Sequence, residues 1–147
     1  MTVTHFPHRV VVDPNVLIAA AISHDQASPP RVILQAATEG RVTLITCPQL
    51  WAELVNVLAR PKIRRRLPGP DAERFTTALR LLGTEVADPV DAPRVVTDAA
   101  DDYLIALARH ESVHALITGD KAVLGAPTPD LLIQTPRQFV EHLTETR

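Results

Sequence analysis

The sequence has little cysteine, no long apolar run and almost no net charge. Its single cysteine, Cys47, excludes a disulfide bond within the chain and is typical of a reducing compartment. Because the chain has no apolar run of about 18 residues and no charged-then-apolar leader, we expect neither a membrane anchor nor export, and a location in the cytoplasm. The net charge of −2 excludes a general electrostatic attraction of the whole molecule to polyanions.

The overall composition is that of an ordinary globular protein. Hydrophobic residues make up 46% and charged residues 22% of the 147 positions, close to the average for folded domains. This length suffices to bury a sizeable core, and no repeat, low-complexity tract or linker divides it. We therefore expect residues 1–147 to form a single domain.

One short motif suggests a zinc hydrolase. His110, Glu111 and His114 have the H-E-x-x-H spacing with which metalloproteases place two imidazoles and a general base on one helix face. Residues 101–110 have the apolar spacing of a helix, whereas residues 113–118 have the composition of a strand. The change from helix to strand separates the two histidines, and no third histidine follows at the usual spacing. We therefore expect surface histidines flanking a turn and no zinc site.

Strand-like and helix-like segments alternate along the chain. Buried strands alternating with helices indicate an α/β fold in which helices cover both faces of a mainly parallel sheet. Such folds bind ligands at the carboxyl ends of the strands, where the strand order reverses. The expected strands are 9–13, 41–46, 84–88, 113–118 and 130–135, and the expected helices are 15–22, 31–40, 48–59, 69–83, 101–110, 121–125 and 136–145.

Two carboxylates lie where predicted strands end. Asp13 ends the first strand, and Asp120 follows the fourth. An isolated carboxylate at such a position is more often a helix N-cap, and Pro14 suits the first turn of a helix while favouring an extended Asp13. Their shared position at strand ends makes both of them candidates for one site.

Glu53 and Asp101 are acidic residues on helix stripes that we expect to face the core. Glu53 lies three residues after Leu50 and four before Val57, and Asp101 shares the inward stripe of its own helix. A core-facing carboxylate is costly unless it is paired or binds a metal, and for Glu53 the alternative is an ion pair with a nearby arginine. Asp102 lies one step round the helix, where the helix dipole explains it equally well, so it ranks second.

Carboxylates gathered at one edge of a sheet repel one another when all are ionised. A divalent cation removes this repulsion, and hard oxygen ligands favour Mg²⁺ or Mn²⁺. Such a site suits the hydrolysis of phosphodiester bonds, because the cation lowers the pKa of a bound water and stabilises charge on the phosphoryl and leaving oxygens.

A basic run follows the third predicted helix. It fits either a solvated helix end, since cations suit a helix C-terminus, or a patch that contacts phosphates. The sequence leaves both interpretations open. The cations of the run are Arg60, Lys62, Arg64, Arg65 and Arg66.

Four stretches in order resemble the motifs of PIN-domain proteins, particularly the bacterial branch of VapC-like ribonucleases that are toxins of type II toxin–antitoxin systems. They are VVVDPNVLIAA, LITCPQLWAELVNVLARPKIRRRL, DAADDYLIALA and ALITGDKAVL, and the similarity runs from about residue 8 to 140. The resemblance implies a compact three-layer α/β/α fold whose first and fourth strands flank the site. It also implies a Mg²⁺- or Mn²⁺-dependent ribonuclease, an RNA substrate, a cognate antitoxin protein and a homodimer.

Carried over by motif, the resemblance implies an acidic quartet of catalytic, metal-binding residues. The quartet is Asp13, Glu53, Asp101 and Asp120, and Asn15 matches the polar residue that commonly follows in the first motif. A shift of one residue in the following loop exchanges Asp101 for Asp102, so Asp102 is also a candidate metal ligand.

The first motif departs from the family pattern. D-T-N or D-T-S is usual, whereas Asp13, Pro14 and Asn15 leave no hydroxyl beside the first carboxylate. Pro14 therefore favours an alternative, a non-catalytic PIN-like module that binds RNA or protein. A third class, phosphoryl transfer through an aspartyl phosphate, fits Asp13 and Lys121 after two strands. D-P-N in place of D-x-D and a core-facing Glu53 argue against it.

Overall fold

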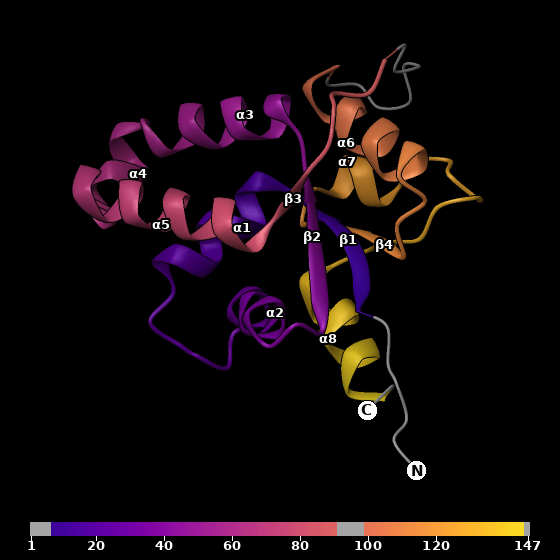
Figure 1. Cartoon of the computed structure of the whole chain (residues 1–147), viewed down its shortest axis with the longest axis horizontal. Helices are drawn as coiled ribbons and strands as arrows, with labels where there is room; N and C mark the ends of the chain where they lie inside the picture. The colour runs from indigo at the N-terminus through magenta and orange to yellow at the C-terminus, as the bar shows by residue number, and fades with distance from the viewer. Residues whose placement is uncertain (1–6, 91–98, 146–147) are drawn as a thin grey trace.

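The computed structural model describes residues 7–90 and 99–145, and of residues 99–102 it describes only the backbone. Within these residues strands alternate with helices, and the sheet lies between helical layers (Figure 1). The strands are β1 (His8–Val12), β2 (Val42–Thr46), β3 (Thr84–Glu85), β4 (Ala115–Ile117) and β5 (Ile133–Gln134). The helices are α1 (Pro14–Ile22), α2 (Pro29–Thr38), α3 (Pro48–Leu58), α4 (Pro61–Arg66), α5 (Gly69–Leu82), α6 (Ala99–His110), α7 (Lys121–Leu124) and α8 (Pro136–Glu145).

The strands form an all-parallel sheet in the order β3-β2-β1-β4-β5. The central strand β1 pairs His8 with Val42 of β2 on one side and Val12 with Ile117 of β4 on the other. The chain builds the sheet outward from β1 through β2 and β3, and then on the other side through β4 and β5. The order therefore reverses between β1 and β4, and folds of this kind bind ligands at the carboxyl ends of the strands where this reversal occurs.

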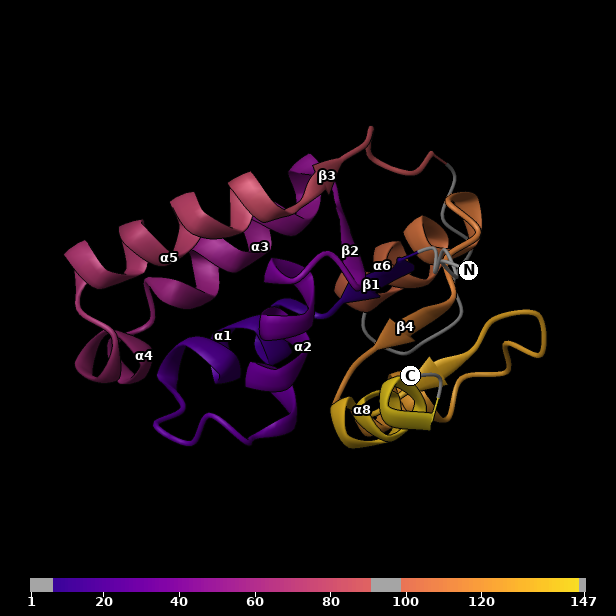
Figure 2. The same ribbon diagram turned by 60° about the horizontal axis from the view of Figure 1, so that its bottom comes forward.

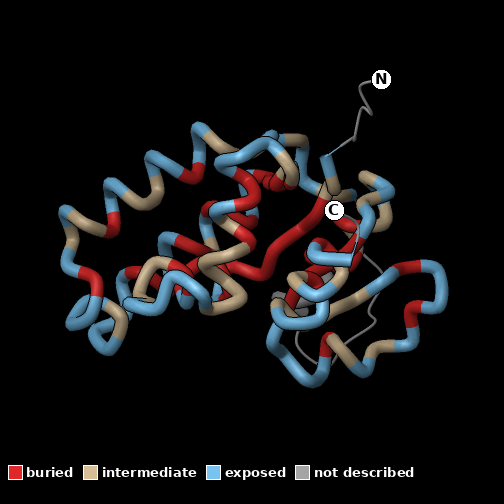
Figure 3. The backbone as a smooth tube through the Cα atoms, turned by 90° about the horizontal axis from the view of Figure 1, so that it is seen from below, coloured by how far each residue is buried: buried red, intermediate tan, exposed pale blue. Residues whose placement is uncertain are grey.

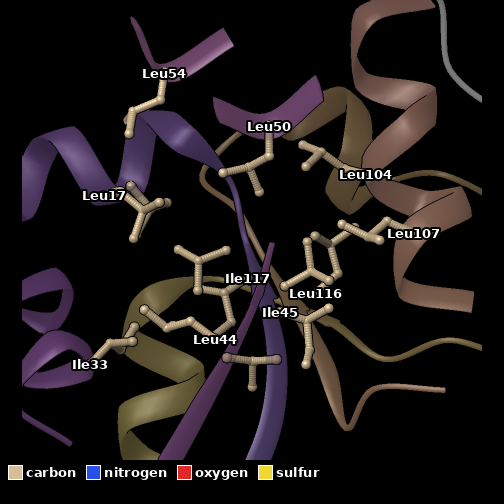
Figure 4. Close-up of a cluster of buried hydrophobic side chains, with 14 of the residues drawn as sticks. Leu17, Ile33, Leu44, Ile45, Leu50, Leu54, Leu104, Leu107, Leu116 and Ile117 are labelled. Atoms are coloured by element: carbon tan, nitrogen blue, oxygen red, sulfur yellow. The ribbon is translucent and has the colours of Figure 1, made fainter. Parts of the chain in front are cut away.

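Helices cover both faces of the sheet because the strands are apolar on both faces. Consecutive strand residues point to opposite sides, which is the pattern of a strand buried within a three-layer domain. The predicted α/β/α architecture is confirmed. In Figure 4, Leu44 and Ile117 lie on the side of Leu17 of α1 and Ile33 of α2, whereas Ile45 and Leu116 lie on the side of Leu104 and Leu107 of α6.

Proline begins many of the helices. A proline suits the first helical position, because the backbone N–H that it lacks would have no partner within the helix and its φ is already helical. Pro61 also separates α4 from α3, so the basic run forms a short helix of its own, with Arg64, Arg65 and Arg66 in its last turn. Helices α1, α2, α3, α4 and α8 begin at Pro14, Pro29, Pro48, Pro61 and Pro136.

Helices α3, α4 and α5 form an arm that projects from one side of the sheet. Figures 1 and 2 both show this arm extending away from α6, with α4 at its far end. The outer part of the arm is thinly packed, because α4 has no buried residue and α5 buries only Ala72 and Leu79, whereas α3 buries five residues. Figure 3 shows the centre of the molecule as mainly buried, whereas buried and exposed residues alternate along the outer helices. Trp51 anchors the arm: it is 4% exposed, and the guanidinium of Arg80 lies 4.7 Å from the centre of its ring.

Most predicted boundaries are confirmed to within two or three residues. Gly40, expected to stop a helix, has φ +79°, a left-handed conformation that favours glycine. The main differences are β3 and β5, which are shorter than predicted and lie at the two edges of the sheet, where each pairs with a single neighbour. None of the helices within residues 7–90 and 99–145 combines the length and the apolar character needed to cross a membrane.

Candidate active site

Asp13 is fixed at the carboxyl end of the central strand. The residue is 3% exposed. Its Oδ1 accepts hydrogen bonds from the backbone N–H of Asn15 at 2.9 Å and from the Asn15 side-chain amide at 3.3 Å, so Asp13 is the N-cap of α1. Asn15 is itself exposed. The strand-end position and the N-cap role considered for Asp13 are therefore both present, and Asn15 lies beside the carboxylate as the motif implies.

Thr118 links the residues that end β1 and β4. Its hydroxyl donates a hydrogen bond to Oδ2 of Asp13 at 2.8 Å and accepts one from the backbone N–H of Asp120 at 3.1 Å. The N–H of Asp13 donates to the carbonyl of Ile117 at 2.9 Å, which continues the pairing of the two strands to their ends. One oxygen of Asp13 is thus oriented by α1 and the other by the residue after β4.

Asp120 lies at the same edge of the sheet but faces solvent. It is exposed, and its Oδ1 accepts a hydrogen bond from the N–H of Ala122 at 2.8 Å, which caps α7. Asp13 and Asp120 therefore have equivalent places, because each follows a strand and caps the helix that comes next.

Glu53 of α3 is bonded to Tyr103 of α6. The Tyr103 hydroxyl donates a hydrogen bond to Oε2 of Glu53, which is half-buried on the apolar stripe of its helix. Burial raises the pKa of Tyr103, Glu53 raises it further, and Cys47 and Asp13 act in the same direction. The phenol is therefore within electrostatic reach of both Glu53 and Asp13, and at neutral pH it keeps the proton that it donates.

The side chain of Asp88 bonds to the backbone at the start of α3. Its carboxylate accepts a hydrogen bond from the N–H of Gln49 at 2.8 Å, whereas the thiol of Cys47 at the N-cap position makes no such bond. Burial raises the pKa of Cys47 to about 11, and the neighbouring Asp88 contributes to the rise. These contacts fix the start of the helix that carries Glu53.

Asp101 and Asp102 lie at the start of α6, just before Tyr103, but their side chains are outside the described residues. Among the side chains that are described, no three His, Cys, Asp or Glu groups are close enough to hold a metal ion. The donors at this edge are carboxylate oxygens, which fit Mg²⁺ or Mn²⁺ in kind. The α6 carboxylates that the sequence predicts for the site are among the side chains that the structure does not describe.

The H-E-x-x-H residues are split between elements, as predicted. His110 ends α6, and the turn that follows contains Ser112 with φ +50°. The carboxylate of Glu111 lies 3.2 Å from the guanidinium of Arg9, and Nδ1 of His114 accepts a hydrogen bond from the Arg9 N–H at 3.0 Å. The motif therefore ties β1 to the turn before β4, at the edge opposite to the acidic residues.

The basic run does not lie with the acidic residues. Helix α4 is at the far end of the arm in Figures 1 and 2, whereas Asp13 and Asp120 lie at the starts of α1 and α7. All five cations are exposed, and within the described part of the chain none of them has an acidic side chain at ion-pair distance. The run is thus an unneutralised positive patch.

Sequence reasoning missed Thr118, Tyr103 and Asp88. A threonine two residues before an N-cap aspartate was a signal for Thr118, because such hydroxyls commonly bond the local backbone. Tyr103 was signalled by a hydroxyl on a buried helix stripe, which needs a partner. No local pattern marks Asp88, because its bond to Gln49 spans 39 residues.

The fold and the site together define a class of protein, a parallel α/β/α domain with acidic residues where the strand order reverses. A family model described as PIN domain matches residues 9–122, and the chain belongs to this family. No curated protein matches the sequence at a significant level.

Solved structures have the same fold at low sequence identity. PAE2754 from Pyrobaculum aerophilum is 14% identical with a TM-score of 0.64, and the match covers 95% of this chain and 90% of that one. VapBC2 from Rickettsia felis, bound to a DNA fragment from its promoter, is 12% identical with a TM-score of 0.60 and coverages of 86% and 98%. VapC20 from Mycobacterium tuberculosis, described as a Sarcin-Ricin loop cleaving toxin, is 14% identical with a TM-score of 0.51 and coverages of 80% and 95%.

Proposed function

We propose that the protein is a metal-dependent endoribonuclease and the toxin component of a toxin–antitoxin module. The observation that carries this proposal is the edge of the sheet where β1 and β4 of a PIN domain end, because Asp13 is buried there and oriented on both oxygens by Asn15 and Thr118. Asp120 follows Thr118 at the same edge. Carboxylates in this position suit the hydrolysis of phosphodiester bonds.

The proposed catalytic carboxylates are Asp13, Glu53, Asp101 and Asp120, with Asp102 as a further metal ligand. Together they would hold Mg²⁺ or Mn²⁺, which when bound lowers the pKa of a water and stabilises charge on the phosphoryl oxygens. Fixed hydrogen bonds hold Asp13 in place before any substrate arrives, which reduces the reorganisation needed during the reaction.

The basic run of α4 would contact RNA phosphates away from the acidic residues. Helix α3 has 11 residues, so it spans about 16 Å at 1.5 Å per residue. A substrate that reaches from the acidic residues to α4 must therefore be several nucleotides long. The proposed contacts are Arg60, Lys62, Arg64, Arg65 and Arg66.

Structural neighbours suggest the partners. VapC20 is described as a toxin that cleaves the Sarcin-Ricin loop, and VapBC2 was solved with promoter DNA. By this likeness we propose that the chain cuts RNA, binds a cognate antitoxin protein, forms a homodimer and acts in the cytoplasm.

A non-catalytic PIN-like module that binds RNA or protein is the second candidate, and Pro14 favours it. This residue takes the place of the hydroxyl that is usual beside the first carboxylate. Thr118 argues for activity, because its hydroxyl supplies Asp13 with a bond from the neighbouring strand. The two candidates differ in whether the acidic site binds a metal.

The first experiment is a calorimetric titration with Mn²⁺, followed by RNA cleavage in Mg²⁺, Mn²⁺ or EDTA, on protein freed of co-purifying partners. We expect metal binding and metal-dependent products with 5′-phosphates, both lost in Asp13→Asn, since asparagine still caps the helix. Asp25→Asn is the matched control, because Oδ1 of Asp25 accepts the N–H of Ala27 at 2.9 Å in an exposed loop. Equal cleavage by wild type and Asp13→Asn would exclude this site. A wild type that binds no Mn²⁺ would favour the non-catalytic module.

A further inference from the structure

The bond from Tyr103 to Glu53 joins the two helices that carry the remaining acidic residues of the site. Helix α3 carries Glu53 and packs against α1 and α4, whereas α6 carries Asp101 and Asp102 and packs against β1 and β4. The bond connects residues 50 positions apart in the chain. It therefore ties together two helices that pack against different elements.

The surroundings of Tyr103 make its hydroxyl a fixed donor. The residue is 4% exposed, and Leu104 and Leu107 of the same helix are fully buried, so α6 has little freedom to turn. The Tyr103 hydroxyl donates its hydrogen bond to Oε2 of Glu53, so it is directed at that carboxylate. Any effect of Tyr103 on a cation must pass through Glu53.

We propose that Tyr103 is a positioning residue of the metal site, which holds the Glu53 carboxylate in the orientation that binds the divalent cation. The inference rests on the proposed function, because Glu53 is a ligand only if the acidic site takes a metal. Partners of a ligating carboxylate fix its direction, and their loss typically weakens metal affinity about 10- to 100-fold.

The test is Mn²⁺ calorimetry on the metal-free chain carrying Tyr103→Phe, which removes one oxygen and keeps the ring. We expect about 10-fold weaker Mn²⁺ binding. In RNA cleavage the Mn²⁺ concentration for half-maximal rate shifts upward by a similar factor, while the rate at saturating Mn²⁺ recovers. Far-UV circular dichroism with heating checks that the variant folds.

Thr128→Val is the matched control for the loss of a buried hydroxyl. Thr128 is 9% exposed, and its hydroxyl donates only to the Ala126 carbonyl, at 3.5 Å, in the loop before β5. A merely structural role of Tyr103 would lower the melting temperature, as the control does, and leave Mn²⁺ affinity at the wild-type value.

The outcomes separate the inference from the proposed function. Mn²⁺ binding by the wild type that is lost in Asp13→Asn and weakened in Tyr103→Phe, with Thr128→Val unchanged, supports both. Wild-type affinity in Tyr103→Phe overturns the positioning role and leaves the nuclease proposal standing. A wild-type chain without Mn²⁺ binding overturns the nuclease proposal and, with it, the inference.

Discussion

The hydroxyl of Thr118 lies 2.8 Å from Oδ2 of Asp13, although the two residues are 105 positions apart in the chain. They meet because β1 and β4 are neighbours, with Val12 paired to Ile117 in the last register position. Parallel strands bring their carboxyl ends to one edge, so the residues that follow them lie side by side. A buried carboxylate acquires hydrogen bonds in this way without any partner close in sequence.

Replacing Thr118 with valine should destabilise the protein. The change keeps the shape of the side chain but leaves Oδ2 of Asp13 with one bond fewer, which costs about 1 to 3 kcal/mol for a buried acceptor. Urea unfolding measures the loss. Thr76→Val is the control, because its hydroxyl donates to the Ala72 carbonyl one turn back in α5. A Thr118→Val chain with the wild-type free energy of unfolding would contradict this prediction.

Removing charge from α4 should weaken RNA binding in a salt-dependent way. With Arg64, Arg65 and Arg66 replaced by glutamine, the slope of log K against log salt should fall by about 2 for single-stranded RNA, because each phosphate contact contributes about 0.7. Fluorescence anisotropy in EDTA measures binding without cleavage. Arg41→Gln, at the amino end of β2, is the control and should keep the wild-type slope. Equal slopes for the triple variant and the wild type would show that these arginines of α4 do not contact RNA phosphates.

Stability should fall as the pH drops below about 6.5, in part because of His8. Its ring lies 5.3 Å from that of His114 and 5.5 Å from that of His142. Burial lowers the pKa of His8, and His114, His142 and the guanidinium of Arg41 lower it further, against a backbone hydrogen bond that raises it. The unfolded chain therefore binds more protons below the ordinary histidine pKa of about 6.5, so the stability present above that pH is lost as the pH falls.

Urea unfolding at pH 7.5 and 5.5 measures this loss. We expect His8→Phe to lose less stability than the wild type over the interval, since it cannot titrate. His110→Gln alters a histidine whose side chain is 71% exposed, and it should lose as much as the wild type. If His8→Phe loses as much stability as the wild type between pH 7.5 and 5.5, groups other than His8 cause the effect.

Cys47 should be inert in the native protein. The residue is fully buried and its pKa is raised to about 11, so at pH 8 about one thiol in a thousand is ionised. Labelling with an aromatic disulfide reagent should be at least about 100-fold slower than in urea, which serves as the control. Rapid labelling of folded protein would show that the start of α3 opens readily.

Local patterns predicted most of the fold. Helix α8 begins at Pro136 and ends at Glu145 as expected, because a proline start and regular apolar spacing are both local signals. The order of the strands was implied only by the family resemblance, since nothing local says that β4 pairs with β1. The shortness of β3 and β5 was missed because their composition resembles that of longer strands, whereas their edge position limits their pairing.

The candidate site was predictable only in part, because local patterns mark single residues and not their partners on other elements. Asp13 and Asp120 were predicted from strand ends and Glu53 from its place on an apolar stripe, and their roles in a site stay predictions. Their partners Thr118 and Tyr103 come from other elements, and tertiary hydrogen bonds over such separations leave no periodic trace in a sequence. The choice between Asp101 and Asp102 stays a prediction, because neither side chain is described.

The capping bonds of Asp13 and Asp120 make the geometry of the site measurable by amide hydrogen exchange. The amide protons of Asn15 and Ala122 are donated to these carboxylates, so their exchange with deuterium depends on the geometry of the acidic edge of the sheet. Exchange of these two amides, followed by NMR, reads out the integrity of the acidic edge with neither metal nor RNA present. A variant that keeps slow exchange in the strands but exchanges these amides rapidly has lost its site while keeping its fold.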